Sequence, residues 1–177
     1  RKKKKTITVK EKQQEKLMQL VEKFDEEMVR FKRHIFNITS QMRYYTELKE
    51  SLNENEVLIH VDFAENYLTK MSTEIQSMHF GASKSQITLH TGVYHMKDQN
   101  SFCTVLDPLQ HGPAAIWVYL DPVLTEIQEK YPLIDTIHFF SDCPSTQYRQ
   151  KNNFFLFTQE LSERGLKSGT WKFHESG

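Results

Sequence analysis

Hydrophobic residues recur along residues 9–52 with the period of a helix that carries one continuous apolar stripe. This segment contains no Gly or Pro, and its apolar positions follow one another at alternating intervals of four and three residues. A heptad period sustained for about five heptads predicts one long helix over residues 9–52. The stripe consists of Leu17, Val21, Phe24, Met28, Phe31, Ile35, Ile38, Met42, Tyr45 and Leu52.

A stripe of this length is stable only when something covers it. A second copy of the chain would cover it in a coiled coil, which would make the protein a homo-oligomer through residues 17–52. The rest of the chain is the other candidate, and a free helix is the third. Phe24, Phe31 and Tyr45 would occupy d positions, where a parallel two-stranded coil prefers Leu. The pattern leaves these alternatives open.

After residue 53 the pattern changes to short apolar runs separated by polar turns. A β-branched run over residues 57–63 predicts a strand, and residues 86–95 and 101–107 predict a hairpin because only a short polar turn separates them. A helix follows from Pro113 to residue 129, with a kink expected at Pro122. Next come a strand over residues 134–142, a helix ending near Gly165 and a last strand over residues 171–175.

The order strand, hairpin, helix, strand, helix, strand is that of the ribonuclease H-like fold. We therefore predict an α/β protein with a ribonuclease H-like mixed sheet flanked by helices and preceded by the long heptad-patterned helix. The predicted organisation is a basic, disordered N-terminus over residues 1–8, the helix and possible coiled coil over residues 9–52, and the ribonuclease H-like domain over residues 53–177.

Two of the predicted strands each deliver an aspartate at their C-terminal end. Asp62 closes the first strand, and Asp142 closes the strand that follows the first body helix. If these strands lie side by side, the two carboxylates come together, as they do in sites that hold a divalent metal ion. Either residue alone is equally well explained as a turn former or a helix cap.

Charge and composition narrow the class of protein. Residues 1–52 carry 14 Lys and Arg against 8 Asp and Glu, whereas the rest of the chain carries 9 against 15, so a basic arm precedes an acidic body. The basic arm suits a nucleic-acid backbone or an acidic partner. With 38% apolar residues, no apolar run near the roughly 20 residues that a membrane span needs, and no signal-peptide pattern, we expect no membrane association.

Cysteine usage and the first residues bear on localisation. Cys103 and Cys143 are the only cysteines and lack the spacing of a zinc site, which favours a reducing, intracellular compartment. The basic cluster over residues 1–5 matches a nuclear localisation signal, so we expect a nuclear or otherwise intracellular protein.

Four sequence motifs resemble those of a known family. They are VDFAENY at 61–67, EIQSMHFG at 74–81, TLHTG at 88–92 and SDCPSTQYR at 141–149. Together they are similar to a family of uncharacterised, transposon-derived animal proteins with an integrase-like, ribonuclease H-like catalytic domain of the Asp-Asp-Glu type. The resemblance covers about residues 50–177. It departs from the family pattern at Cys143, where the family usually has Gly, and in lacking the family's last helix.

This resemblance implies metal-dependent DNA strand cleavage and transfer. Asp62 and Asp142 would hold Mg²⁺ or Mn²⁺, and Glu175 is the candidate for the third acid unless that acid lies beyond Gly177. Glu65 and Glu74 are weaker candidates for further ligands. DNA would be the partner, contacted through its backbone by residues expected to begin the second body helix: Gln147, Tyr148, Arg149 and Lys151.

Two competing interpretations accompany the catalytic one. The missing last helix favours a domesticated, catalytically inactive transposase that serves as a DNA- or protein-binding scaffold and oligomerises through its N-terminal helix. The histidines are also dense for one domain, which raises a zinc site as an alternative. Their spacing argues against zinc, because His90 and His95, the only pair at a suitable interval, would point to opposite faces of one strand.

Overall fold

A computed structural model describes residues 16–64, 67–68, 86–106, 112–143 and 147–175. The predicted basic N-terminus, the weaker candidates Glu65 and Glu74, and the first helical positions before residue 16 lie outside these ranges. The chain divides into two compact units, residues 1–36 and 37–177. The predicted domain boundaries after residues 8 and 52 stay predictions.

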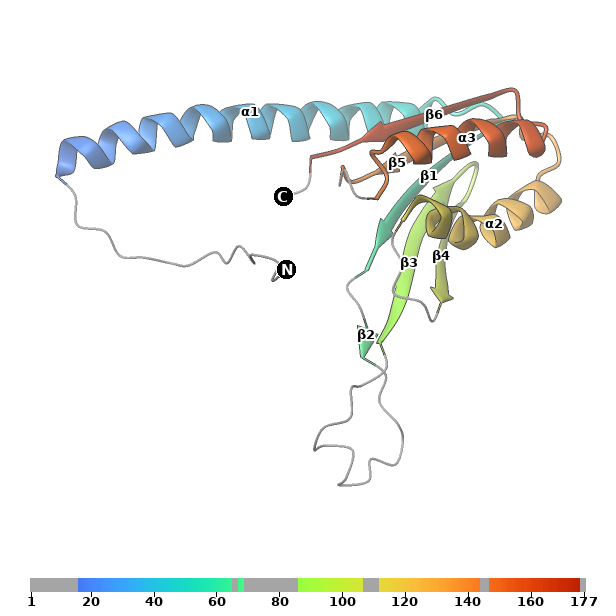
Figure 1. Ribbon diagram of the computed structural model, residues 1–177. Coiled ribbons are helices and arrows are strands. Elements are labelled where there is room, and N and C mark those ends of the chain that lie inside the picture. Colours follow the sequence, from blue (N-terminus) through green and yellow to red (C-terminus); the bar gives the residue numbers. More distant parts are fainter. Residues whose placement is uncertain (1–15, 65–66, 69–85, 107–111, 144–146, 176–177) are drawn as a thin grey trace, which may run out of the picture. The chain divides into compact units, whose positions relative to one another are not determined.

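The long helix is present as α1, Leu17–Glu50 (Figure 1). It belongs to both units, because the boundary between them falls at residue 36. Within the first unit its large apolar side chains are exposed, with Phe24 61% and Phe31 54% accessible. Within the second unit the stripe meets the sheet through Tyr45, whose ring lies 4.9 Å from that of Phe140.

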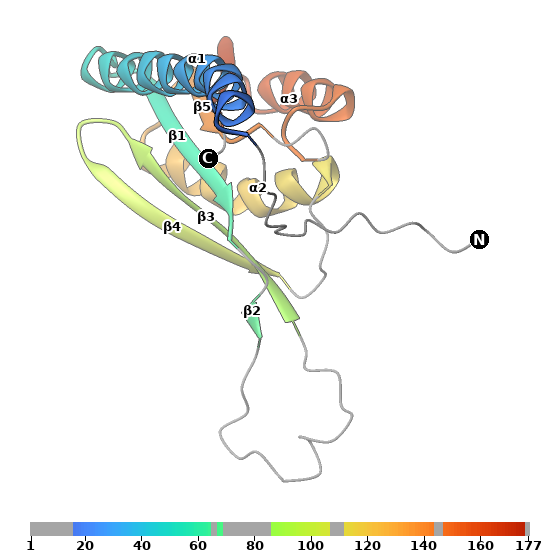
Figure 2. The ribbon, with the colours of Figure 1, turned by 90° about the vertical axis from the view of Figure 1, so that its left-hand side faces the viewer.

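The second unit is built on a mixed sheet. The strands are β1 (Glu56–Phe63), β2 (Tyr67–Leu68), β3 (Gln86–His95), β4 (Gln99–Leu106), β5 (Thr136–Ser141) and β6 (Ser168–Phe173). Across the sheet they run in the order β4, β3, β1, β5, β6, and β2 also pairs with β3. The β3 strand is antiparallel to β1 and β4 (Figure 2). The β5 strand is parallel to β1 and β6. This topology confirms the predicted ribonuclease H-like fold class.

Two helices cover one face of the sheet and the second half of α1 covers the other. Helix α2 (Pro113–Lys130) and helix α3 (Lys151–Glu163) pack on the face formed by Val57, Ile59 and Val61. The alternating residues of β1 point the opposite way, and His60 among them meets Tyr45 of α1. The helix α2 continues through Pro122 to Lys130, so the expected kink does not end it.

Helix α3 starts later than the sequence predicts. It begins at Lys151, because Gln150 before it is extended, with φ −142° and ψ 156°. Gly169 explains how closely α3 then approaches β6. A Cβ atom at that position would lie 2.6 Å from the Phe157 ring and 2.8 Å from a Leu161 methyl group. The missing side chain therefore lets α3 pack closely on β6, which begins at Ser168, three residues before the predicted position of 171.

No helix among the described residues combines the length and the apolar character that crossing a membrane requires.

Candidate metal centre

The two predicted acids lie next to each other at one edge of the sheet. The parallel register of β1 and β5 pairs Val61 with Ser141, so Asp62 and Asp142 are the next residues in line on neighbouring strands. Neighbouring strands are about 4.8 Å apart, and the two-residue alternation puts both side chains on the same face. The side-by-side arrangement that the sequence required for a paired site is therefore present, while the role of either residue as a metal ligand stays a prediction.

The environment of Asp142 disfavours its charged form. Burial raises the pKa of the Asp142 carboxyl, the nearby charge of Asp62 raises it further, and His174 partly offsets both effects. The Oδ1 atom of Asp142 is buried and has no hydrogen-bond partner among the described residues. An acid in this state gains most from a cation, which would neutralise both carboxylates and satisfy the buried oxygen.

Histidines and aromatic rings lie on the same face of the sheet as the acid pair. The His60 ring lies 5.6 Å from that of His174 and 5.5 Å from that of Tyr45. Burial lowers the pKa of His60, and the neighbouring His174 lowers it further while Asp62 opposes the shift. The Tyr45 hydroxyl is 2.7 Å from Nε2 of His95, whose pKa burial also lowers. Desolvation thus favours the neutral imidazoles of His60 and His95.

His90 lies on the other face of β3, as the alternation predicted. Its ring packs against Phe63 and Tyr119 under α2, whereas His95 meets Tyr45 of α1. In the part of the chain that the structure describes, no group of three or more His, Cys, Asp or Glu side chains is positioned to hold a metal ion. The zinc alternative therefore gains no support from the arrangement of these residues.

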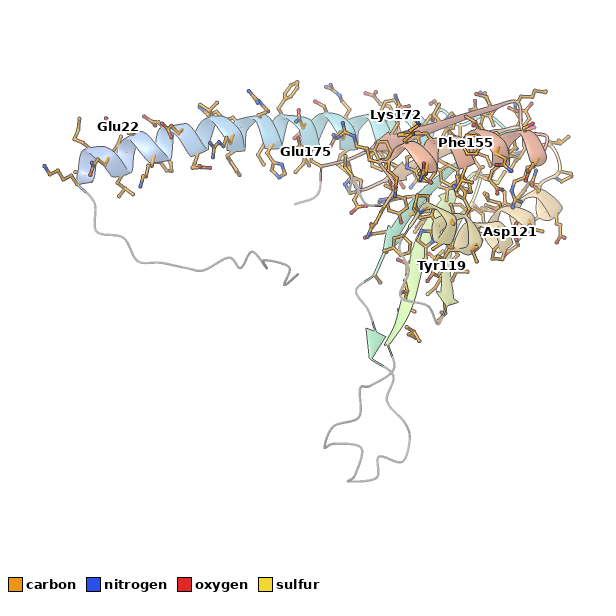
Figure 3. The ribbon with its side chains drawn as sticks, viewed as in Figure 1. Glu22, Tyr119, Asp121, Phe155, Lys172 and Glu175 are labelled. Atoms are coloured by element: carbon orange, nitrogen blue, oxygen red, sulfur yellow. The ribbon has the colours of Figure 1, made fainter. Side chains whose placement is uncertain are left out.

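Glu175, the predicted third acid, contacts α1. Its side chain accepts a 2.5 Å hydrogen bond from Nδ2 of Asn37, and its backbone N–H donates to Oε1 of Gln41 at 2.9 Å. Figure 3 shows Glu175 at the end of β6, beyond Lys172. Asn37, Gln41 and Glu175 all belong to the second unit. The role of Glu175 as third ligand stays a prediction.

The four residues predicted to contact DNA do not share one environment. Arg149 and Lys151 are exposed, and Gln147 is half-buried. Arg149 donates from Nη1 to the Cys143 sulfur at 3.3 Å, and both residues line a cavity of about 290 Å³ together with His174 and Glu175. A cationic side chain is therefore present beside the strand end that carries Asp142.

Tyr148 is a core residue, which does not fit its predicted contact with a DNA backbone. Its side chain is fully buried, and its hydroxyl lies 3.0 Å from Nε2 of His90. Burial holds the pKa of Tyr148 well above its usual range. Its backbone oxygen accepts from Nδ2 of the buried Asn153, so this hydrogen bond ties Tyr148 to the first turn of α3. The prediction failed because it placed Tyr148 in a solvated first helical turn.

The sequence interpretation missed the position of His174. The register of β5 and β6 pairs Ser141 with Phe173, which makes His174 the neighbour of Asp142 on the side away from Asp62. The signal in the sequence was the position of His174 directly after Phe173, within the predicted last strand. That signal has no meaning until the register between strands distant in sequence is known.

The fold and the site define the chain as a ribonuclease H-like α/β protein with an acid pair at the C-terminal ends of adjacent parallel strands. Residues 41–177 match the model of a domain of unknown function, DUF8701, and the chain belongs to that family. No curated protein matches the chain.

One solved structure is similar to part of the chain. It is the crystal structure of the mariner Mos1 paired end complex with Mg, which aligns at a TM-score of 0.41 and 11% identity. The alignment covers 82% of this chain and 43% of that chain, so this chain spans less than half of the mariner protein. At this score the likeness does not establish a common function.

Proposed function

We propose that this protein is a transposase-like enzyme that cleaves and transfers DNA strands with the help of a divalent metal ion. The observation that carries the proposal is the register of β1 and β5, which sets Asp62 beside Asp142 at one edge of the sheet. The unpartnered, buried Oδ1 of Asp142 supports it, because this oxygen has the character of a ligand rather than of a turn former.

The donor set fits Mg²⁺ or Mn²⁺. Both ions prefer oxygen ligands, and Mg²⁺ is commonly held by only one or two carboxylates together with substrate phosphate and water. A cation held by Asp62 and Asp142 would supply Lewis-acid activation of the attacking hydroxyl and neutralise charge on the phosphate. Because two carboxylates alone bind such ions weakly, we expect modest affinity in the absence of DNA.

DNA would lie along the acid edge with its phosphates near Arg149 and Lys151. Both side chains are exposed, and Arg149 lines the cavity next to Cys143. Gln147 belongs to the same proposed contact set, whereas the buried Tyr148 does not. Such contacts position a backbone without reading sequence.

The test is a titration of the wild type and of Asp62→Asn/Asp142→Asn with Mn²⁺, followed by calorimetry. We expect saturable binding by the wild type and its loss in the double variant, because the variant removes both anionic ligands. Cleavage of a labelled DNA duplex should require Mn²⁺ or Mg²⁺ and should fall by at least about 10²-fold in the double variant, as expected for loss of metal-based charge stabilisation.

A matched control is Asp98→Asn/Asp121→Asn, which removes two exposed carboxylates elsewhere in the second unit. This variant should bind Mn²⁺ and cleave DNA like the wild type. If the control and the Asp62/Asp142 variant respond alike, the metal-dependent enzyme is excluded.

A second function, that of an assembly scaffold, is favoured by the first unit. Seven large apolar side chains of α1 before residue 32 are at least 49% exposed: Leu17, Met18, Leu20, Val21, Phe24, Val29 and Phe31. We propose that residues 17–36 associate with a second copy of the chain. In a parallel, in-register pair, Glu27 at a g position would face Lys32 at the following e position of the other copy, which favours that arrangement.

The scaffold proposal predicts an oligomer that depends on the stripe. Phe24→Glu/Phe31→Glu should convert it to a monomer in sedimentation equilibrium, because like charges would replace two apolar layers. Glu22→Lys/Glu26→Lys, two changes on the outer side of the helix, should leave the oligomer intact. A monomeric wild type at about 100 μM would contradict self-association.

A further inference from the structure

We propose that His174 completes the metal site as its third ligand, through Nε2, alongside Asp62 and Asp142. This inference rests on the proposed metal-binding function of the acid pair and assigns the ligand that the pair lacks.

The register of three parallel strands places these residues in one row. Val61, Ser141 and Phe173 are paired across β1, β5 and β6, and the row that follows them is Asp62, Asp142 and His174. The backbone N–H of His174 donates to the Ser141 carbonyl at 2.9 Å, so the pairing continues to the last residue of the row. Asp142 thus lies in the middle, with one candidate ligand on each neighbouring strand.

Ring contacts place the imidazole on the same face as the acids. The His174 ring stacks on Phe140 at 5.4 Å, with 24° between the planes, and lies 5.6 Å from the His60 ring. Phe140 and His60 each precede an acid of the row by two residues, so they mark its face. His174 also lies close enough to Asp142 to interact with it electrostatically, and this interaction lowers the pKa of the Asp142 carboxyl.

The second nitrogen of the ring is held as it is in metal-ligating histidines. The Nδ1 atom of His174 lies 3.2 Å from the Glu175 carbonyl oxygen. When Nδ1 donates to a carbonyl, the neutral tautomer carries its lone pair on Nε2, which is the arrangement that orients a histidine ligand. No group of three ligands is formed among the described residues, so ligation requires the His174 ring to leave its stack on Phe140 and turn towards Asp142.

Glu175 is less well placed than His174. It follows His174 by one residue and lies beyond the end of β6 at Phe173. Its carboxylate and its backbone N–H are both engaged by α1, through Asn37 and Gln41. Imidazole binds Co²⁺ and Zn²⁺ better than Mn²⁺, and it binds Mg²⁺ least well. A site with one imidazole and two carboxylates should therefore prefer Mn²⁺ to Mg²⁺.

The experiment uses the full chain with ¹⁵N-labelled histidine and Mn²⁺ as the probe. Pulsed electron paramagnetic resonance of bound Mn²⁺ should detect coupling to a histidine nitrogen in the wild type. The coupling should disappear in His174→Ala and persist in His60→Ala, which removes the other imidazole near the row. Calorimetry should show Mn²⁺ affinity at least about tenfold weaker in His174→Ala and within about twofold of wild type in Glu175→Gln.

His174→Asp provides the rescue. It should restore binding and shift the preference towards Mg²⁺, since an oxygen ligand replaces nitrogen. The inference is overturned if the wild type shows Mn²⁺ bound through Asp62 and Asp142 without nitrogen coupling, or if Glu175→Gln rather than His174→Ala weakens binding. Failure of the proposed function has a different signature. In that case Asp62→Asn/Asp142→Asn would leave Mn²⁺ binding unchanged. The wild-type resonance result decides the question even if His174→Ala does not fold.

Discussion

Replacing Trp171 by Ala should destabilise the protein by about 3–5 kcal/mol, the usual cost of deleting a buried indole. Trp171 is 8% exposed and joins β6 to both helices of its face. Its ring stacks on Phe139 at 4.5 Å and meets the rings of Trp117 and Phe157 edge-on. A loss of this size is a large fraction of the 5–15 kcal/mol that typically stabilises a domain, so partial unfolding at 37 °C is expected.

Urea denaturation followed by circular dichroism measures this effect, and Trp171→Phe is the matched variant. Phe retains an aromatic ring but loses the indole N–H that donates to Ser141 Oγ at 3.0 Å. That variant should lose about 1–3 kcal/mol, because the buried hydroxyl is left without its donor and the ring is smaller. Equal losses in the two variants would show that the stacked rings contribute little.

Replacing Asp142 by Asn should have opposite effects on stability in the absence and presence of metal. The folded state raises the pKa of Asp142, so it binds the proton more tightly than the unfolded chain does. The wild type should therefore gain stability from this group as the pH falls through its folded pKa, and should bear the full cost of the charged form at neutral pH. Asn removes that cost, so the metal-free variant should melt no lower than the wild type at pH 7.

Saturating Mn²⁺ should reverse the order. At 100 times the dissociation constant, a ligand specific for the folded state adds about 2.7 kcal/mol, and only the wild type should receive it. Calorimetric melting at pH 5 and pH 7, with and without Mn²⁺, measures both effects. The control is Asp121→Asn on α2, labelled in Figure 3, which loses an ion pair with Arg164. That variant should melt lower and keep the response to Mn²⁺, and a matching response from Asp142→Asn would contradict the assignment.

The sequence predicted those parts of the fold whose signals are local. The β-branched run of β1 and the short polar turn between β3 and β4 specify a strand and a hairpin without reference to the rest of the chain. The pairing of Asp62 with Asp142 was predicted only on the condition that two strands lie side by side. The parallel pairing of β1 with β5 meets that condition. No local sequence pattern specifies which distant strands pair, or in which register.

The same limit explains what the sequence did not provide. His174 lies beside Asp142 only because β6 pairs with β5. The buried position of Tyr148 depends on a partner that is distant in sequence, because its hydroxyl bonds to His90, 58 residues away. The heptad stripe was read as one surface, yet Tyr45 covers the sheet while Phe24 is exposed. A periodic pattern states that a face is apolar, and tertiary packing decides what covers each part of it.

The sheet register also bears on the order in which the chain folds. The β3–β4 hairpin closes across three residues, whereas the row at the acid edge joins Asp62 to a partner 80 positions further along the chain. Closing a long loop costs more entropy than closing a hairpin, and contacts of high sequence separation slow folding. We therefore expect the hairpin to form early and the acid edge to assemble late. Recovery of Mn²⁺ binding after dilution from urea would then report the last stage of refolding, after most of the helical signal has returned.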